Sequence, residues 1–213
     1  MYSADENWSS FDSLPGRRIS RRKTSRTDFE FLDSSGLSFG TSKLRTNRKI
    51  GSEFVAAQGS FQTVRRTLPK GVRRSRGDYE LALERTDKAA EPELLMRSTG
   101  HFGWVKPSSG EPYDTPSQWS LPDGTRLAAF CVGRYEPFHV LLLRSGQDIR
   151  VAFRFLAPRI QLLRRWFGIR ESTNFLHGEA VISEDRSDLS DLLPILVLGF
   201  EVLQAMNTVP RGG

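Results

Sequence analysis

An apolar run near the carboxyl end, from Asp191 to Met206, constrains the fold more than any other stretch of the chain. It predicts a helix over about residues 188–206, because Asp and Ser at its start can cap the first amide groups and Pro194 lies early. Its apolar side chains, placed at about 100° per residue, point in nearly every direction, so the helix is enclosed either by protein or by lipid. A membrane span needs about 20 apolar residues, and this run is shorter and contains Glu201 and Gln204. We therefore expect a helix enclosed by the rest of the chain.

The chain before this helix consists of short apolar runs separated by turn residues. Asp78 to Glu84, for example, alternates polar and apolar residues in the way typical of a half-buried strand. Asp33-Ser34-Ser35-Gly36, Pro122-Asp123-Gly124 and Ser145-Gly146 supply tight turns. About twelve strands are predicted, at residues 29–31, 37–41, 53–57, 61–66, 78–84, 93–98, 101–105, two within 119–130, 136–144, 147–155 and 177–183.

Many short strands and one enclosed helix are compatible if the sheet closes around the helix, which also removes exposed sheet edges. The predicted fold class is therefore mainly β: a closed antiparallel barrel of about twelve strands around a central C-terminal hydrophobic helix. The barrel domain is assigned to residues 27–209. Residues 1–26 are polar, rich in Ser and Arg and without helical or strand period, and are predicted to be a disordered basic tail. Within it, Arg-Arg-Ile-Ser (17–20) has the pattern of a basic kinase target, with a solvated arm as the alternative.

Strand after strand followed by Asp-Leu-Leu-Pro-Ile-Leu-Val-Leu-Gly-Phe-Glu-Val-Leu resembles the tubby C-terminal-like superfamily. That superfamily includes tubby proteins, phospholipid scramblases and plant LURP-one-related proteins. Phe-Leu-Asp-Ser-Ser-Gly-Leu-Ser-Phe-Gly (31–40) is similar to the first hairpin of such domains. The resemblance covers roughly residues 29–207 and implies a twelve-stranded barrel around a central helix. The chain lacks a palmitoylated cysteine cluster, a proline-rich amino-terminal segment and the closing motif of tubby proteins, so the resemblance leaves the activity open.

The whole chain has a net charge of +6, and its positive charge is concentrated in the first third of the sequence. This asymmetry suggests an anionic partner, either nucleic acid or membrane phosphate. In clusters of four to eight Lys and Arg beside a membrane, each basic residue contributes about 1 kcal/mol to the attraction of anionic lipid. A lipid- or phosphate-binding loop is therefore predicted; its residues are Arg65, Arg66, Lys70, Arg73, Arg74 and Arg76. The alternative is a solvated loop, or counter-charges for Asp78 and Glu80.

A second surface is predicted in Pro158 to Arg170, which combines basic and aromatic residues. If this stretch is helical, Ile160, Leu163 and Phe167 share one face, with arginines beside or opposite them. Such a short basic helix suits a membrane interface, where indole rings favour the headgroup level. The predicted membrane-contact residues are Arg164, Arg165, Trp166 and Phe167. The alternative is that the aromatic residues plug one mouth of the barrel.

Residues suited to catalysis or metal binding do not form a recognisable motif. The histidines, His101, His139 and His177, are too widely spaced for the usual close pairs of a zinc site. Cys131, the single cysteine, lies in an apolar stretch where it is expected to be a small buried hydrophobe. Neither a phosphate-binding glycine loop nor a nucleophile elbow occurs. We expect no enzyme activity, no cofactor and no metal.

The first functional hypothesis is a non-enzymatic domain that binds an anionic membrane surface or phosphoinositide through the basic loop. The absence of an 18-residue apolar run and of a signal-peptide pattern favours a cytoplasmic protein, with peripheral membrane attachment as an addition. Alternatives are a phospholipid scramblase-like protein, a nucleic-acid-binding module and a protein scaffold. Against nucleic acid, the basic stretches contain few aromatic residues for base stacking, only Phe54 and Phe61 between Lys43 and Arg76.

Overall fold

A computed structural model of the chain describes most of the predicted sheet and the predicted C-terminal helix from Leu189 onward. The described residues are 11–25, 27–44, 51–56, 59–66, 78–87, 93–101, 117–120, 126–132, 140–146, 148–156, 177–183 and 189–208. Structural statements below concern these residues.

The described residues form one antiparallel sheet and one helix. The strands are β1 (Arg17–Lys23), β2 (Asp28–Leu32), β3 (Ser38–Leu44), β4 (Ser52–Ala56), β5 (Gly59–Arg66), β6 (Asp78–Arg85), β7 (Glu93–His101), β8 (Ser117–Ser120), β9 (Arg126–Val132), β10 (Val140–Ser145), β11 (Asp148–Leu156) and β12 (His177–Ile182). Each strand pairs with the next along the chain, and β1 pairs with both β2 and β12. The prediction of a mainly β fold with a single C-terminal helix is confirmed for the described chain.

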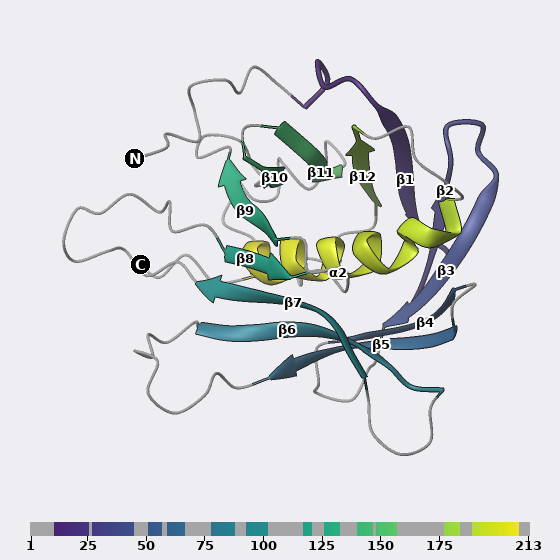
Figure 1. Cartoon of the computed structure of the whole chain (residues 1–213). Helices are drawn as coiled ribbons and strands as arrows, with labels where there is room; N and C mark the ends of the chain where they lie inside the picture. Colours follow the sequence, from purple (N-terminus) through teal and green to yellow (C-terminus); the bar gives the residue numbers. More distant parts are fainter. Residues whose placement is uncertain are drawn as a thin grey trace, which may run out of the picture.

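The helix, α2 (Leu189–Thr208), runs through the middle of the curved sheet (Figure 1). It contacts β3 to β6 on one side and β10 and β11 on another. Its buried side chains point in several directions, and they are Leu193, Leu196, Val197, Leu198, Phe200, Glu201, Val202 and Leu203. The described side chains of this helix are therefore buried on several sides, as its all-round apolarity predicts. Within the described chain, no helix combines the length and apolar character that a membrane crossing requires.

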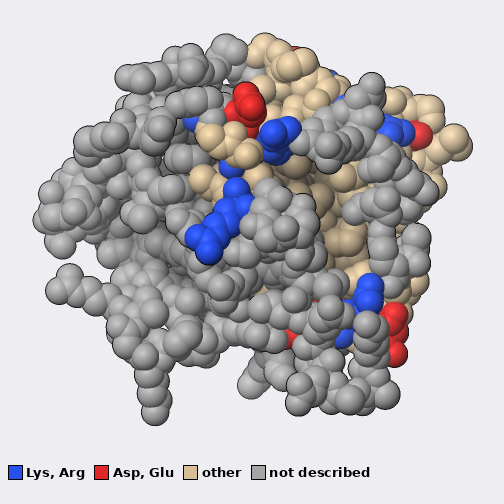
Figure 2. Space-filling view, in the orientation of Figure 1, with Lys and Arg blue, Asp and Glu red and all other residues tan. Residues whose placement is uncertain are grey.

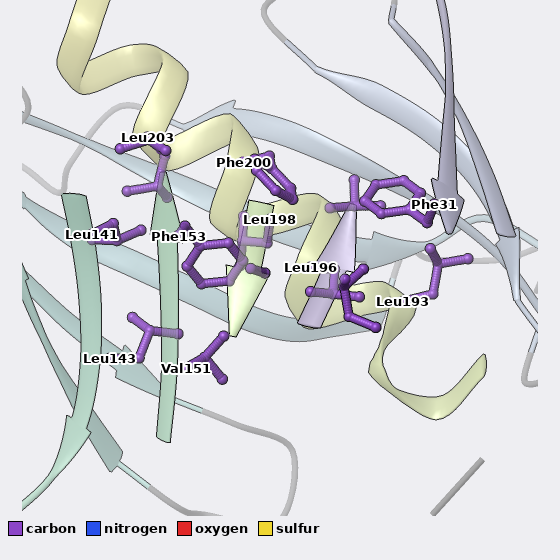
Figure 3. Close-up of a cluster of buried hydrophobic side chains, with 14 of the residues drawn as sticks. Phe31, Leu141, Leu143, Val151, Phe153, Leu193, Leu196, Leu198, Phe200 and Leu203 are labelled. Atoms are coloured by element: carbon purple, nitrogen blue, oxygen red, sulfur yellow. The ribbon is translucent and has the colours of Figure 1, made fainter. Parts of the chain in front are cut away.

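Close approach between α2 and the strands depends on two glycines. A Cβ at Gly178 in β12 would lie 2.4 Å from the ring of Phe200, and one at Gly199 in α2 would lie 2.2 Å from the ring of Phe153. The missing side chains let Phe153 and Phe200 meet edge to face, with ring centroids 5.3 Å apart. Figure 3 shows side chains of β10, β11 and α2 facing one another in this core. The interior is therefore packed with side chains around the helix.

The prediction that residues 1–26 form a disordered tail is wrong for the described part of that segment. Residues 17–23 form β1, which has hydrogen-bonded neighbours on both sides. Ile19 and Arg21 point inward and are almost completely buried. The period-two pattern was missed because Arg21 occupies an interior position that is normally apolar. The domain therefore begins earlier than residue 27, and Phe11 is also buried.

Most of the other predicted strands occur with shifted ends. The predicted strand at 93–98 continues to His101 as β7, and β10 is described from Val140 onward. Residues 102–105 and 136–139 of the predicted strands lie outside the described residues. Cys131 lies in β9, as predicted, opposite Leu141. In the first predicted turn, the carboxylate of Asp33 accepts hydrogen bonds from the amides of Ser35 and Leu37, at 2.8 and 3.0 Å. The predicted turn at residues 122–124 and the predicted helix at 158–170 lie outside the described residues.

Candidate anion-binding end of the sheet

The antiparallel order places the chain connections alternately at the two ends of the sheet. The odd-numbered strands finish at one end, here called the basic end, and the even-numbered strands finish at the opposite end, here called the acidic end. The last turns of α2 also lie toward the basic end, because Phe200 meets Gly178 and Glu201 meets Ser52, both near the starts of even-numbered strands. In Figure 1 the arrowheads of β5 and β7 point to the side on which α2 ends.

The sequences that join strands at the two ends differ sharply in charge. Connections at the basic end (24–27, 45–51, 67–77, 102–116, 133–139 and 157–176) contain fourteen Lys and Arg against four Asp and Glu. Those at the acidic end (33–37, 57–58, 86–92, 121–125, 146–147 and 183–188) contain two Lys and Arg against seven Asp and Glu. The order of the strands thus assigns net charges of +10 and −5 to the two sets of connections.

Both predicted surface sites fall in sequence that joins strands at the basic end, or directly before it. Arg65 and Arg66 are the last two residues of β5, opposite Leu81 and Glu80 of β6. The other members of the predicted binding loop, Lys70, Arg73, Arg74 and Arg76, lie outside the described residues, in the sequence that joins β5 to β6. The predicted membrane-contact residues, Arg164, Arg165, Trp166 and Phe167, also lie outside, in the sequence that joins β11 to β12.

The strands themselves carry a smaller positive excess, fourteen Lys and Arg against nine Asp and Glu. On the outer face, Asp28, Lys43 and Glu53 occupy neighbouring positions on β2, β3 and β4. Arg22 donates a hydrogen bond of 2.8 Å to Glu30 on the adjacent strand. On the face shown in Figure 2, several of the described Lys and Arg lie beside an Asp or Glu. The net charge of +10 given for the basic end counts the connecting sequences alone.

An open groove of about 740 Å³ lies against β2 to β5. Its lining includes Asp28, Glu53 and Lys43 together with the hydroxyl groups of Thr41, Ser60 and Thr86. Since two carboxylates accompany one ammonium group, this groove is unsuited to an anionic ligand. His177 is exposed, His139 lies outside the described residues, and the described part of the chain holds no group of residues that could bind a metal ion.

An interior charge pair, Arg21 and Glu201, lies between β1 and α2 near the basic end. Arg21 is 3% exposed and Glu201 is 2% exposed. The guanidinium carbon of Arg21 lies 3.6 Å from the ring centroid of Phe29 and 5.2 Å from that of Phe200. Ser52 donates a hydrogen bond to Oε1 of Glu201. Nε and Nη1 of Arg21 and Oε2 of Glu201 have no hydrogen-bond partner among the described residues.

Burial dominates the protonation behaviour of this pair. It lowers the pKa of Arg21 to about 10, against the opposing effect of the Glu201 charge. Burial also raises the pKa of Glu201 above its ordinary 4.5, although the hydrogen bond from Ser52 and the charge of Arg21 act in the other direction. Desolvation therefore exceeds attraction for both partners.

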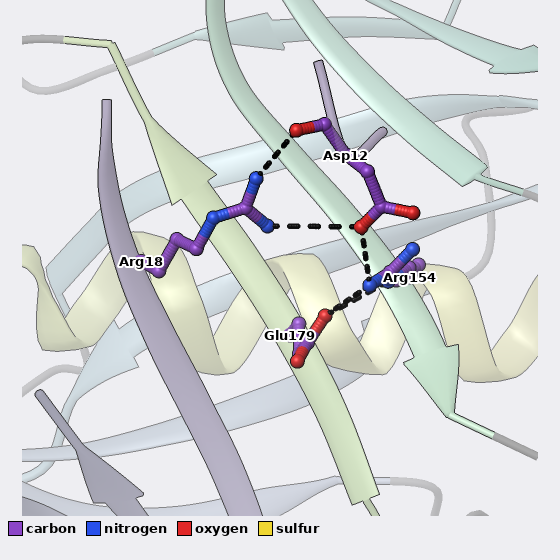
Figure 4. Close-up of polar contacts among 4 residues, drawn as sticks. All are labelled: Asp12, Arg18, Arg154 and Glu179. Carbon is purple, nitrogen blue, oxygen red and sulfur yellow. Dashed lines mark hydrogen bonds and ion pairs between the residues drawn. The ribbon is translucent and has the colours of Figure 1, made fainter. Parts of the chain in front are cut away.

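A second cluster, the outer clamp, holds the segment before β1 against the outside of the sheet (Figure 4). Arg154 of β11 donates hydrogen bonds to Asp12 at 2.9 Å and to Glu179 of β12 at 2.6 Å. Arg18 donates a 2.9 Å hydrogen bond to the carbonyl oxygen of Asp12. The ring of Phe11 lies 4.3 Å below the guanidinium carbon of Arg154.

Phe11 completes a small apolar cluster on the outside of β10 to β12. Its buried neighbours are Val140, Leu142, Ala152 and Val181. Sequence reasoning missed both this contact and the interior charge pair. The available signals were the unbroken apolar run Val140 to Leu143, which leaves Val140 and Leu142 facing outward, and the alternation of Ile19 with Arg21. Both signals require the strand pairing before they can be interpreted.

Comparison of the chain with protein-family models, curated proteins and solved structures finds no match.

Proposed function

We propose that the chain is a tubby-like barrel whose basic end binds an anionic membrane surface or a phosphoinositide headgroup. The observation that supports this most is the order of the strands. It assigns the sequences containing Lys70, Arg73, Arg74 and Arg76 and those containing Arg164 and Arg165 to the same end of the sheet. Pairing of β1 with both β2 and β12 supports a closed barrel around the helix.

The charge distribution favours a surface-bound orientation. Each Lys or Arg near an anionic membrane contributes about 1 kcal/mol, so several of the fourteen cations at the basic end suffice for reversible attachment. The acidic end would be repelled by the same membrane. The barrel axis is therefore proposed to be perpendicular to the membrane surface, with the C-terminal end of α2 toward the lipid. The protein is proposed to be cytoplasmic and peripherally attached, without enzyme activity.

Vesicle sedimentation tests the proposal. The triple variant Arg73→Glu/Arg74→Glu/Arg76→Glu is compared with Lys88→Glu/Arg186→Glu, which changes the two cations in the acidic-end connections. On vesicles of phosphatidylcholine with phosphatidylserine or a phosphatidylinositol phosphate, we expect the triple variant to lose at least about a hundredfold in affinity. The control should lose less than about threefold, because its changes lie at the other end.

Equal binding of the wild type to neutral and anionic vesicles contradicts the proposal, as does equal loss by the two variants. Competition with duplex DNA distinguishes the nucleic-acid alternative, since displacement from vesicles by DNA at low concentration would favour it. Movement of labelled lipid between leaflets by purified protein would favour the scramblase-like alternative. A stoichiometric protein partner retained at high salt would favour the scaffold.

A further inference from the structure

The hydrophobic effect distinguishes weakly how far α2 is inserted along the sheet axis, and the close fits of Gly199 to Phe153 and of Phe200 to Gly178 are its position-specific apolar contacts. Aliphatic residues recur along the helix, so a shift by about one turn, about 5.4 Å, would place Leu196, Val197 and Val202 where Leu192, Leu193 and Leu198 lie, one aliphatic side chain for another. The hydrophobic effect is non-directional and distinguishes such positions weakly. Polar residues distinguish them strongly, because a buried polar group is costly without its partner.

Glu201 is the polar residue in α2 best placed to make this distinction. Its carboxylate accepts the hydrogen bond from Ser52 at the start of β4 and lies within the electrostatic influence of Arg21 on β1. These strands approach the helix from different parts of the sheet. A shift of one turn would separate the carboxylate from both and leave it among aromatic and aliphatic side chains.

Arg21 is itself held in one place. Its guanidinium stacks on Phe29, its neighbour across β2 is Phe31, and its neighbour across β12 is Gly178. The absent side chain of Gly178 admits the ring of Phe200, so Arg21 contacts the helix one residue before Glu201. The first strand and the last helix of the fold are joined through these contacts.

We propose that Arg21 and Glu201 are positioning residues that set the register of α2 within the sheet. The pair does this at a cost in stability, since each charge is removed from water and neither is fully hydrogen-bonded. Ser52 contributes the second directional contact. This role does not depend on what the basic end binds.

A double-mutant cycle measures whether the two charges interact. The variants are Arg21→Met, Glu201→Gln and the double variant, with urea unfolding followed by tryptophan fluorescence. We expect Glu201→Gln to favour folding at least about tenfold more in the Arg21→Met background than in the wild type, because only the wild type loses the attraction to Arg21. The matched control is Arg22→Met with Glu30→Gln, an ion pair on the outer surface between β1 and β2, for which we expect coupling below about fivefold.

The register of α2 within the sheet is measured in a separate experiment, from nuclear Overhauser effects between the helix and the strands at two positions along the helix. The side chain of Leu193 lies against Gly40, and the ring of Phe200 lies against Gly178. We expect the wild type to give one set of these contacts. The double variant should fold at least as stably but give additional sets, with faster hydrogen exchange in β1 than in β6.

Two results would overturn the proposal. One is coupling no larger than that of the control pair. The other is a double variant with the same single set of contacts and unchanged exchange, which would mean that apolar packing sets the register. If the double variant fails to fold, the pair is essential for stability and the proposal is equally wrong. Arg21→Lys, which keeps the charge, should retain the single set of contacts.

Discussion

The interior charge pair and the outer clamp are built from the same parts but behave in opposite ways. Each has an arginine stacked on phenylalanine and a carboxylate nearby: Arg21 with Phe29 and Glu201 inside, Arg154 with Phe11 and Asp12 outside. Inside, burial lowers the pKa of Arg21 and raises that of Glu201.

Outside, the partners dominate. The hydrogen bond from Arg154, and then its charge, lower the pKa of Asp12. Burial acts to lower the pKa of Arg154, but hydrogen bonds to Asp12 and Glu179 and their charges outweigh it and raise the pKa. The comparison teaches that access to water decides whether an arginine–carboxylate pair stabilises this fold. The predictions that follow test the contrast, beginning with the largest effect.

Phe200→Ala should be the most damaging change, because Phe200 is 1% exposed and contacts Phe31, Phe153 and Phe155. Removing a fully buried phenylalanine ring costs about 3–5 kcal/mol through lost transfer energy and the cavity left behind. Urea unfolding measures the loss. Leu37→Ala, at a side chain that is 69% exposed, is the control and should change little. A loss below about 1 kcal/mol for Phe200→Ala would mean that the interior repacks freely.

Glu201→Gln should reveal the interior pair through pH. A carboxyl whose folded pKa is raised binds its proton more tightly in the folded state, so its contribution to stability is present below pH 4.5 and is lost as the pH rises through the folded pKa. The glutamine variant lacks this loss. Its free energy of unfolding relative to the wild type should therefore increase from pH 4 to neutrality. A constant difference would show that burial does not dominate at Glu201.

Phe11→Ala should cost less than Phe200→Ala, although Phe11 is only 4% exposed. The ring lies at the outer surface, where the segment before β1 can move away and let water replace it, so no enclosed cavity remains. We expect about 1–3 kcal/mol. Hydrogen exchange should become faster around the outer cluster, at Ala152 and Val181, before it does in α2. Uniformly faster exchange would mean that the clamp is part of the main folding unit.

The helix and most strands could be predicted because their signals are local. All-round apolarity indicates that α2 is enclosed, and alternation indicates strands such as β6. The interior charge pair could not be predicted, because burial of Arg21 follows from the pairing of β1 with both β2 and β12, which joins residues far apart in sequence. The sequence around an arginine in a solvated tail does not differ from that around a buried arginine such as Arg21, and only the strand pairing distinguishes the two.

The charge of the basic end shows the same dependence on topology. Sequence reasoning selected the loop after Arg66 and the stretch around Trp166 as separate features. The order of the strands assigns both to one end and assigns the acidic connections to the other. An antiparallel sheet of known order therefore adds information on charge that no single segment carries.

Asp12→Asn should give the smallest effect, and its pH dependence should have the opposite sign to that at Glu201. A carboxyl whose folded pKa is lowered stabilises the fold above its unfolded pKa, 3.8, and loses that contribution as the pH falls through the folded value. The advantage of the wild type over Asp12→Asn should therefore be present at neutral pH and disappear in acid.

Salt supplies the control for this last comparison. Asp12 and Arg18 are exposed, so 1 M salt, with a Debye length of about 3 Å, should remove most of the Asp12→Asn difference at neutral pH. The Glu201→Gln difference should change little, because the interior pair is screened from ions by the surrounding side chains. If both differences fell equally with salt, Glu201 would be in contact with solvent, and the distinction between an interior and an outer arginine–carboxylate cluster would be lost.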